Sequence, residues 1–164
     1  MTTPPLIAPA TPADAGEILT VQRAAYVTEA QHYSAPFLPP LTETLDEILA
    51  VLAGPTTVLV ARAGHRLVGS ARALISEGTA HVGRLAVAPD QQGRGIGTLL
   101  LTAVEQACAD RASRFALYTG AASQGNLRLY RRHGYEIVGN RPDDNGISLA
   151  MLEKRLVSPP RTDA

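Results

Sequence analysis

The stretch Ala88-Pro-Asp-Gln-Gln-Gly-Arg-Gly-Ile-Gly-Thr-Leu-Leu100 decides the fold, because it joins a predicted strand to a predicted helix. The apolar run 82–87 before it is typical of a strand, and Pro89 with Asp90 ends that run. Apolar residues at helical spacing follow the glycines, namely Ile96, Leu100, Val104 and Cys108. Glycines before a helix let backbone N–H groups converge at its positive end. The stretch therefore predicts a cradle for phosphate or pyrophosphate.

The spacing of the glycines limits which phosphate-containing ligand this loop could bind. A P-loop requires a lysine directly after its last glycine, and the chain has one lysine, Lys154, far from this loop. A dinucleotide fingerprint counted from Gly93 requires glycine at position 98, where Thr98 stands. The remaining pattern, Gln92-x-x-Gly95-x-Gly97, resembles the acetyl-coenzyme A signature of the GCN5-related N-acetyltransferase (GNAT) superfamily. The alternative is a loop that only turns the chain.

Length and composition favour one domain, which we place at residues 1–157, with a frayed tail at 158–164. The 164 residues carry 15 basic and 15 acidic side chains, so charge favours neither a nucleic acid nor a membrane as partner. The single cysteine, Cys108, allows no internal disulfide. The N-terminus lacks the pattern of a signal peptide, and no apolar run is long enough to span a bilayer. We therefore expect a cytoplasmic protein.

Hydrophobic periodicity predicts α-helices and β-strands in a definite order along the chain. The predicted strands are 6–10, 57–62, 66–75, 80–87, 114–119, 135–138 and 147–154, and the predicted helices start at Thr11, Thr42, Ile96 and Ser123. This order indicates an α/β (mixed α+β) protein with a twisted, mixed sheet of about seven strands flanked by about four helices. The order is similar to that of the GNAT fold, which implies that the sheet splays at the strand before the glycine-rich loop.

The resemblance also implies which residues bind the coenzyme. The loop residues, whose backbone would hold the pyrophosphate, are Gln92, Gly93, Arg94, Gly95, Ile96, Gly97 and Thr98. The strand edge formed by Leu85, Ala86 and Val87 would pair with the pantetheine arm and polarise the thioester oxygen. An ordinary core strand is the alternative for these three residues, and both roles are compatible.

A second motif, Ser123 to Tyr135, resembles the family's helix that ends in Leu-Tyr-x-x-x-Gly-Phe/Tyr. In that motif the residue at the Tyr130 position is the general acid that protonates the coenzyme thiolate. A phenol with a pKa of about 10 stays protonated at neutral pH, so it can donate to a thiolate whose conjugate acid has a pKa of about 8.5. Asn126 lies one helical turn earlier and would bind the pantetheine amides. Many relatives have asparagine where this chain has Ser123, a candidate N-cap, which shifts coenzyme contacts to Asn126.

His81 is the candidate general base, because it lies on the predicted strand four residues before Leu85. Relatives place a glutamate or a histidine at this distance, and an imidazole titrates near neutral pH. It would take a proton from the acceptor amine, through a water molecule. An ordinary strand histidine is the alternative. Weaker candidates for the acceptor pocket, placed by resemblance, are Tyr26, Glu29, His32 and Tyr33.

The resemblance thus implies an acetyl-CoA-dependent N-acetyltransferase in which a primary amine attacks the thioester directly in a ternary complex. Acetyl-CoA is the acyl donor, and no metal is expected. The acceptor is a small-molecule or peptide amine that the sequence does not specify. Because members of the family often dimerise, a homodimer is compatible with the resemblance. The alternatives are transfer of a longer acyl group and a non-catalytic acyl-CoA sensor.

Overall fold

The computed structural model describes residues 3–156 and contains one seven-stranded sheet with the order β1-β2-β3-β4-β5-β7-β6. The strands are β1 (Leu6–Pro9), β2 (Thr57–Ala63), β3 (Arg66–Ser76), β4 (Thr79–Val87), β5 (Arg114–Gly120), β6 (Glu136–Pro142) and β7 (Ser148–Arg155). All neighbours are antiparallel except β4 and β5, which are parallel. The predicted mixed sheet is confirmed. The expected frayed tail at 158–164 lies outside the described residues.

The described residues form five α-helices and two short 3-10 turns, where about four helices were expected. The helices are α1 (Ala15–His32), α2 (Pro39–Thr42), α3 (Leu45–Ala53), α4 (Ile96–Cys108) and α5 (Gln124–Arg132), and the turns are η1 (Pro12–Asp14) and η2 (Pro89–Gln91). The helix expected from Thr42 to residue 53 is divided. It breaks because Thr44 caps α3, accepting a 3.2 Å hydrogen bond from the backbone N–H of Glu47.

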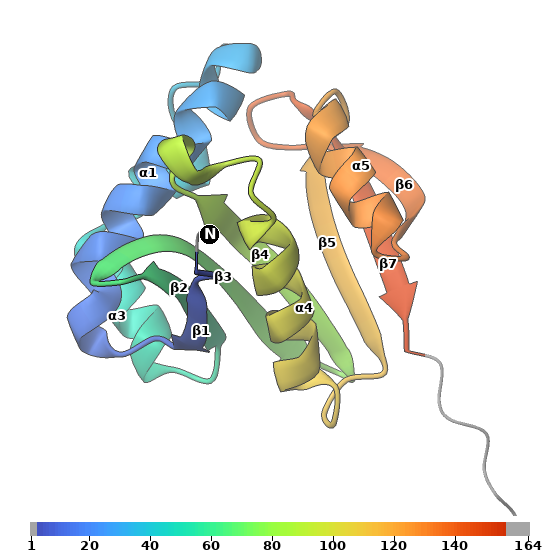
Figure 1. Ribbon diagram of the computed structural model, residues 1–164. Coiled ribbons are helices and arrows are strands. Elements are labelled where there is room, and N and C mark those ends of the chain that lie inside the picture. The colour runs from blue at the N-terminus through green and yellow to red at the C-terminus, as the bar shows by residue number, and fades with distance from the viewer. Residues whose placement is uncertain (1–2, 157–164) are drawn as a thin grey trace, which may run out of the picture.

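Helices cover both faces of the sheet (Figure 1). On one face α4 and α5 bury apolar side chains against the middle strands, among them Leu101, Val104 and Leu127. The side chain of Cys108 is fully buried in the same core. On the other face α1 and α3 pack against β2 and β3. In the part of the chain that the structure describes, no helix has the length and hydropathy needed to cross a membrane.

The parallel strands β4 and β5 remain paired over three residues only, from Thr79 opposite Arg114 to His81 opposite Ala116. Beyond this point the two strands diverge, and the gap widens toward the end of β4 (Figure 1). A bulge lies in the same half of β4, where its register with β3 shifts and Arg84 adopts a left-handed φ of 51°. The expected splay before the glycine-rich loop is therefore present. We call the space between the two diverging strands the wedge.

Candidate active site

The glycine-rich loop begins at the end of β4 and ends at the first turn of α4. Gly93 and Gly95 have φ values of 77° and 83°, a conformation that favours glycine. Arg66 fixes the start of the loop with two hydrogen bonds of 2.6 and 2.7 Å to Asp90, and this contact holds the pKa of that carboxyl well below its usual range. Because a helix leaves the N–H groups of its first turn unpaired, the loop presents backbone donors around Gly97.

Side chains of the loop contribute less than its backbone. The amide Nε2 of Gln92 donates a 3.1 Å hydrogen bond to the carbonyl of Val87, which closes the loop onto β4. Arg94 is exposed and donates to Gln91 at 3.3 Å. The side chain of Ile96 is buried in the core, so only its backbone is available to a ligand. Thr98 is half-buried on the first turn of α4.

The expected coenzyme edge of β4 is paired with β3 on one side, Ala86 opposite Ser70 and Val87 opposite Gly69. On its other side β5 has already diverged, so this backbone faces the wedge. The carbonyl of Leu85 accepts a 3.4 Å hydrogen bond from the hydroxyl of Tyr26 on α1. The structure thus joins two residue groups predicted separately, the coenzyme edge and the acceptor pocket.

Tyr130 is buried on α5, and its ring lies edge-on to that of Tyr135, with centroids 5.9 Å apart. Among the described residues, no hydrogen-bond partner reaches its hydroxyl. Burial raises the pKa of this phenol, and Tyr26 and Glu29 raise it further because they lie close to it. A protonated, unpaired hydroxyl at this position is available as a proton donor.

Ser123 is the N-cap residue of α5, as expected, but its side chain makes no capping hydrogen bond to the helix. Its hydroxyl instead donates to Glu29 at 2.8 Å and lies 2.7 Å from the hydroxyl of Tyr33. The backbone N–H of Ala122 also donates to Tyr33, at 3.2 Å. A side chain at Gly120 would overlap the Tyr33 ring, so the absence of a side chain there admits the aromatic ring. These contacts fix the end of α1 to the segment between β5 and α5.

Asn126 lies on α5 and is half-buried. Its amide nitrogen donates a 3.2 Å hydrogen bond to the hydroxyl of Thr119 on β5. This contact orients the side chain while its carbonyl oxygen has no partner among the described residues. Asn126 therefore retains an acceptor for a ligand amide.

His81 is exposed on β4, in the last row where β4 still pairs with β5. No described residue makes a hydrogen bond to its ring. The structure therefore places His81 at the closed end of the wedge, while Tyr130 lies near Tyr26 and Glu29. His32 is the last residue of α1 and stacks edge-on against Tyr33 at 4.8 Å.

Several charged residues of this region were not singled out in the sequence. Glu43 lies in the break between α2 and α3, and Arg72 and Arg84 approach it from β3 and β4. Because these residues lie far apart in the sequence, no periodic pattern indicates that they meet.

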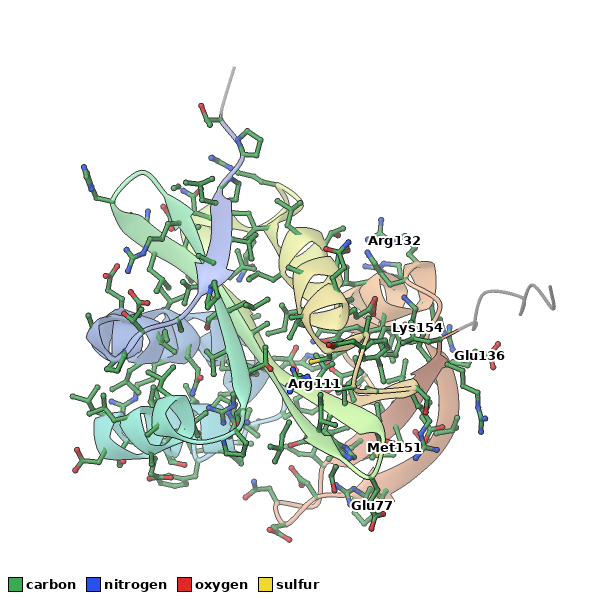
Figure 2. The ribbon with its side chains drawn as sticks, turned by 90° about the horizontal axis from the view of Figure 1, so that it is seen from below. Glu77, Arg111, Arg132, Glu136, Met151 and Lys154 are labelled. Carbon is green, nitrogen blue, oxygen red and sulfur yellow. The ribbon has the colours of Figure 1, made fainter. Side chains whose placement is uncertain are left out.

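The charged residues at the end of α5 are arranged differently. Arg132 points outward from this end, and Lys154 lies beside it, bound to Glu105 at 2.8 Å (Figure 2). Residues 3–156 contain no cluster of three or more metal-ligating side chains.

Comparison with known proteins agrees with this geometry. The model of a family described as acetyltransferase (GNAT) domain matches residues 24–156. Mycothiol acetyltransferase of Geodermatophilus obscurus is 39% identical over 85 residues, which is 51% of this chain and 27% of that relative. The match therefore spans about a quarter of the relative's length.

Two solved structures share the fold over nearly the whole chain. PaiA N-acetyltransferase of Thermoplasma acidophilum, in complex with coenzyme A, has a TM-score of 0.77 at 17% identity and covers 94% of this chain and 100% of its own. YncA of Salmonella typhimurium, with acetyl-CoA, has a TM-score of 0.78 at 18% identity and covers 99% of each chain. The loop, the diverging strands and the family match lead to one conclusion: the chain belongs to the GNAT acetyltransferase family.

Proposed function

We propose that this protein transfers the acetyl group of acetyl-CoA to an amine acceptor, by direct attack of the amine on the thioester. The observation that carries the proposal is the wedge, where the free edge of β4 leads into the glycine-rich loop. Tyr26 donates to the carbonyl of Leu85 on this edge, and the buried Tyr130 lies close to Tyr26. The structural neighbours PaiA and YncA were solved with coenzyme A and with acetyl-CoA, respectively, which supports acetyl-CoA as the ligand of this fold.

In this proposal the coenzyme is held mainly by backbone groups. The N–H groups of 93–98 bind the pyrophosphate at the positive end of α4. The free edge of β4 at 85–87 pairs with the pantetheine arm and polarises the thioester oxygen. Tyr26 fixes the carbonyl of Leu85, which keeps this edge in place. Asn126 supplies a side-chain acceptor for a pantetheine amide.

The proton transfers fall to two titratable groups. His81 takes a proton from the acceptor ammonium through water, and the neutral amine then attacks the carbonyl carbon. When the tetrahedral intermediate collapses, the C–S bond breaks and Tyr130 gives its proton to the departing thiolate. The nitrogen of the new amide loses its extra proton to water, and the Tyr130 phenolate takes up a proton from water to restore the phenol. Burial favours the neutral phenol, so Tyr130 stays protonated until the thiolate forms.

The test is an acceptor screen with thiol detection. The protein is incubated with acetyl-CoA and one amine at a time, covering amino acids, peptides, polyamines and aminoglycosides, and the released thiol of coenzyme A is measured. Release that depends on both the amine and the protein supports the proposal. Binding of acetyl-CoA without release for any amine would favour the sensor alternative. Faster turnover of propionyl- or butyryl-CoA would favour the longer-chain alternative.

A further inference from the structure

Three arginines from three elements surround one carboxylate on the α1 side of the wedge. Arg72 donates two hydrogen bonds to Glu43, of 3.1 and 2.7 Å. Arg23 donates to the backbone carbonyl of Glu43 at 3.0 Å. The terminal nitrogen of Arg84 lies 3.8 Å from the same carboxylate. The Glu43 side chain is 8% exposed and those of Arg72 and Arg84 are 19% exposed, so these three groups are largely desolvated, whereas Arg23 is exposed.

The carboxylate of Glu43 does not neutralise the cluster. Arg72 occupies both of its oxygens, and the amide of Gln22 donates to Oε1 as well, at 3.2 Å. Arg84 is left beyond hydrogen-bond distance, and its Nε is buried without a partner. Within residues 3–156, no other carboxylate forms an ion pair with these arginines. A buried guanidinium without a full partner is costly, so the site favours a further anion.

Arg84, whose guanidinium forms no hydrogen bond with any described residue, lies next to the proposed reaction site. Arg84 directly precedes Leu85, whose carbonyl holds the hydroxyl of Tyr26. Burial raises the pKa of Tyr26 to about 12; Arg84 lowers it and Glu29 raises it, because both charges lie close to that phenol. Tyr26 and Glu29 are three residues apart on α1, hence on the same side of the helix.

The surroundings of Tyr26 therefore carry opposite charges on its two sides. Toward β4 stands Arg84, with 19% of its side chain accessible. Toward β5 and α5 stands Glu29, held by the hydroxyl of Ser123 at 2.8 Å and close to Tyr130. An acceptor bound between these two side chains would meet a carboxylate at its amine end and a guanidinium at its other end.

We propose that the acceptor carries a carboxylate close to its reactive amine, as an amino acid does, and that Arg84 binds this carboxylate while Glu29 attracts the ammonium. In this proposal Arg84 determines substrate specificity, because it binds the substrate but takes no part in bond formation or cleavage. This inference rests on the proposed function, because it names the substrate class for the same site.

The test compares matched acceptors in the thiol-release assay. The twenty L-amino acids are screened first. Each one turned over is compared with its carboxamide and with the amine that lacks the carboxyl group. A hydrogen-bonded ion pair predicts that removing the carboxylate lowers kcat/KM about 10- to 100-fold, mainly through KM.

Variants then connect this preference to Arg84. Arg84→Gln is expected to abolish the preference by raising KM for the amino acid, while kcat/KM for the carboxamide stays within about 3-fold. Arg84→Lys keeps the charge and should retain part of the preference. Arg111→Gln is the matched control, because Arg111 lies beyond the C-terminal end of α4 (Figure 2). The acetyl-CoA-induced rise in Tm checks that each variant is folded.

The outcomes separate the inference from the function beneath it. Equal turnover of amino acids, carboxamides and simple amines by the unmodified protein would overturn the inference and leave the proposed function standing. A carboxylate preference that survives in Arg84→Gln would overturn the assignment of Arg84. Absence of thiol release with every amine would remove the proposed function, and the inference with it.

Discussion

Replacing Tyr130 by phenylalanine removes one oxygen atom and keeps the ring that packs edge-on against Tyr135. Among the described residues this hydroxyl has no hydrogen-bond partner, so we expect Tm to stay within about 2 °C of the unmodified protein. If the hydroxyl protonates the thiolate, the rate of acetyl transfer should fall about 10²- to 10⁴-fold, the range for a general acid. Affinity for acetyl-CoA should be nearly unchanged.

The neighbouring tyrosine provides a matched control with the opposite expectation. The hydroxyl of Tyr135 donates a 2.9 Å hydrogen bond to Glu105, which also binds Lys154 at 2.8 Å. Tyr135→Phe therefore removes one hydrogen bond to a partly buried carboxylate and leaves Oε2 of Glu105 with only the 3.3 Å hydrogen bond from Lys154, at a cost of about 1.5 to 3 kcal/mol. For a chain of this size that corresponds to a fall in Tm of about 3 to 12 °C. Its turnover at a temperature where it is folded should be unchanged.

The assay is a single-turnover measurement of acetyl transfer, so that product release does not mask the chemical step, together with thermal melts of both variants. We expect one substitution to change the rate and the other to change the stability. If Tyr130→Phe transfers the acetyl group at the unmodified rate, the hydroxyl is not the acid and the tyrosine has a packing role. A large loss of stability in Tyr130→Phe would show that its hydroxyl has a partner that our reasoning omits.

Three further perturbations test other parts of the site. Acetyl-CoA at about 100 times its Kd should raise Tm by about 5 to 10 °C, and Gly95→Val should abolish this rise. Gly64, in the turn between β2 and β3, also has a positive φ, so Gly64→Val is the control: it should lose stability but retain the rise in Tm. If His81 is the base, the rate of acetyl transfer should increase with pH through neutrality. His81→Gln should lose this dependence and recover activity at high pH, where the amine is already neutral. If His81→Gln has the same pH profile as the unmodified protein, His81 has only a structural role. Burial raises the pKa of Glu43, but hydrogen bonds from Arg72 and Gln22 bring it below its ordinary value of 4.5. The ionised Glu43 therefore stabilises the folded protein above pH 4.5, and this stabilisation is lost as the pH falls below that value. Thermal melts from about pH 6 to 3 should therefore show a smaller acid-induced fall in Tm for Glu43→Gln than for the unmodified protein, and equal slopes would contradict the reasoning.

The sequence by itself determined the features that depend on short stretches of chain. The strand, the glycines and the helix from Val82 to Cys108 are local, because positive φ at Gly93 and Gly95 and apolar residues at helical spacing need no distant partner. The order of elements, the mixed sheet and the motif around Tyr130 follow from the same kind of signal. The start of α3 was misplaced at Thr42, although Thr44 with Glu47 three residues later is also a local signal for a helix N-terminus.

Only the tertiary structure decided which distant residues share the site. The hydroxyl of Ser123 could have capped α5 locally, yet it donates to Glu29, which lies 94 residues away in the sequence. The arginines near Glu43 likewise come from separate strands and from α1. Hydrophobic periodicity predicts which side of a helix or strand is buried, but it does not predict which charged residue of another helix or strand will lie next to that side. Those pairings arise because β4 and β5 part after three residue pairs and α1 contacts both sides of the opening.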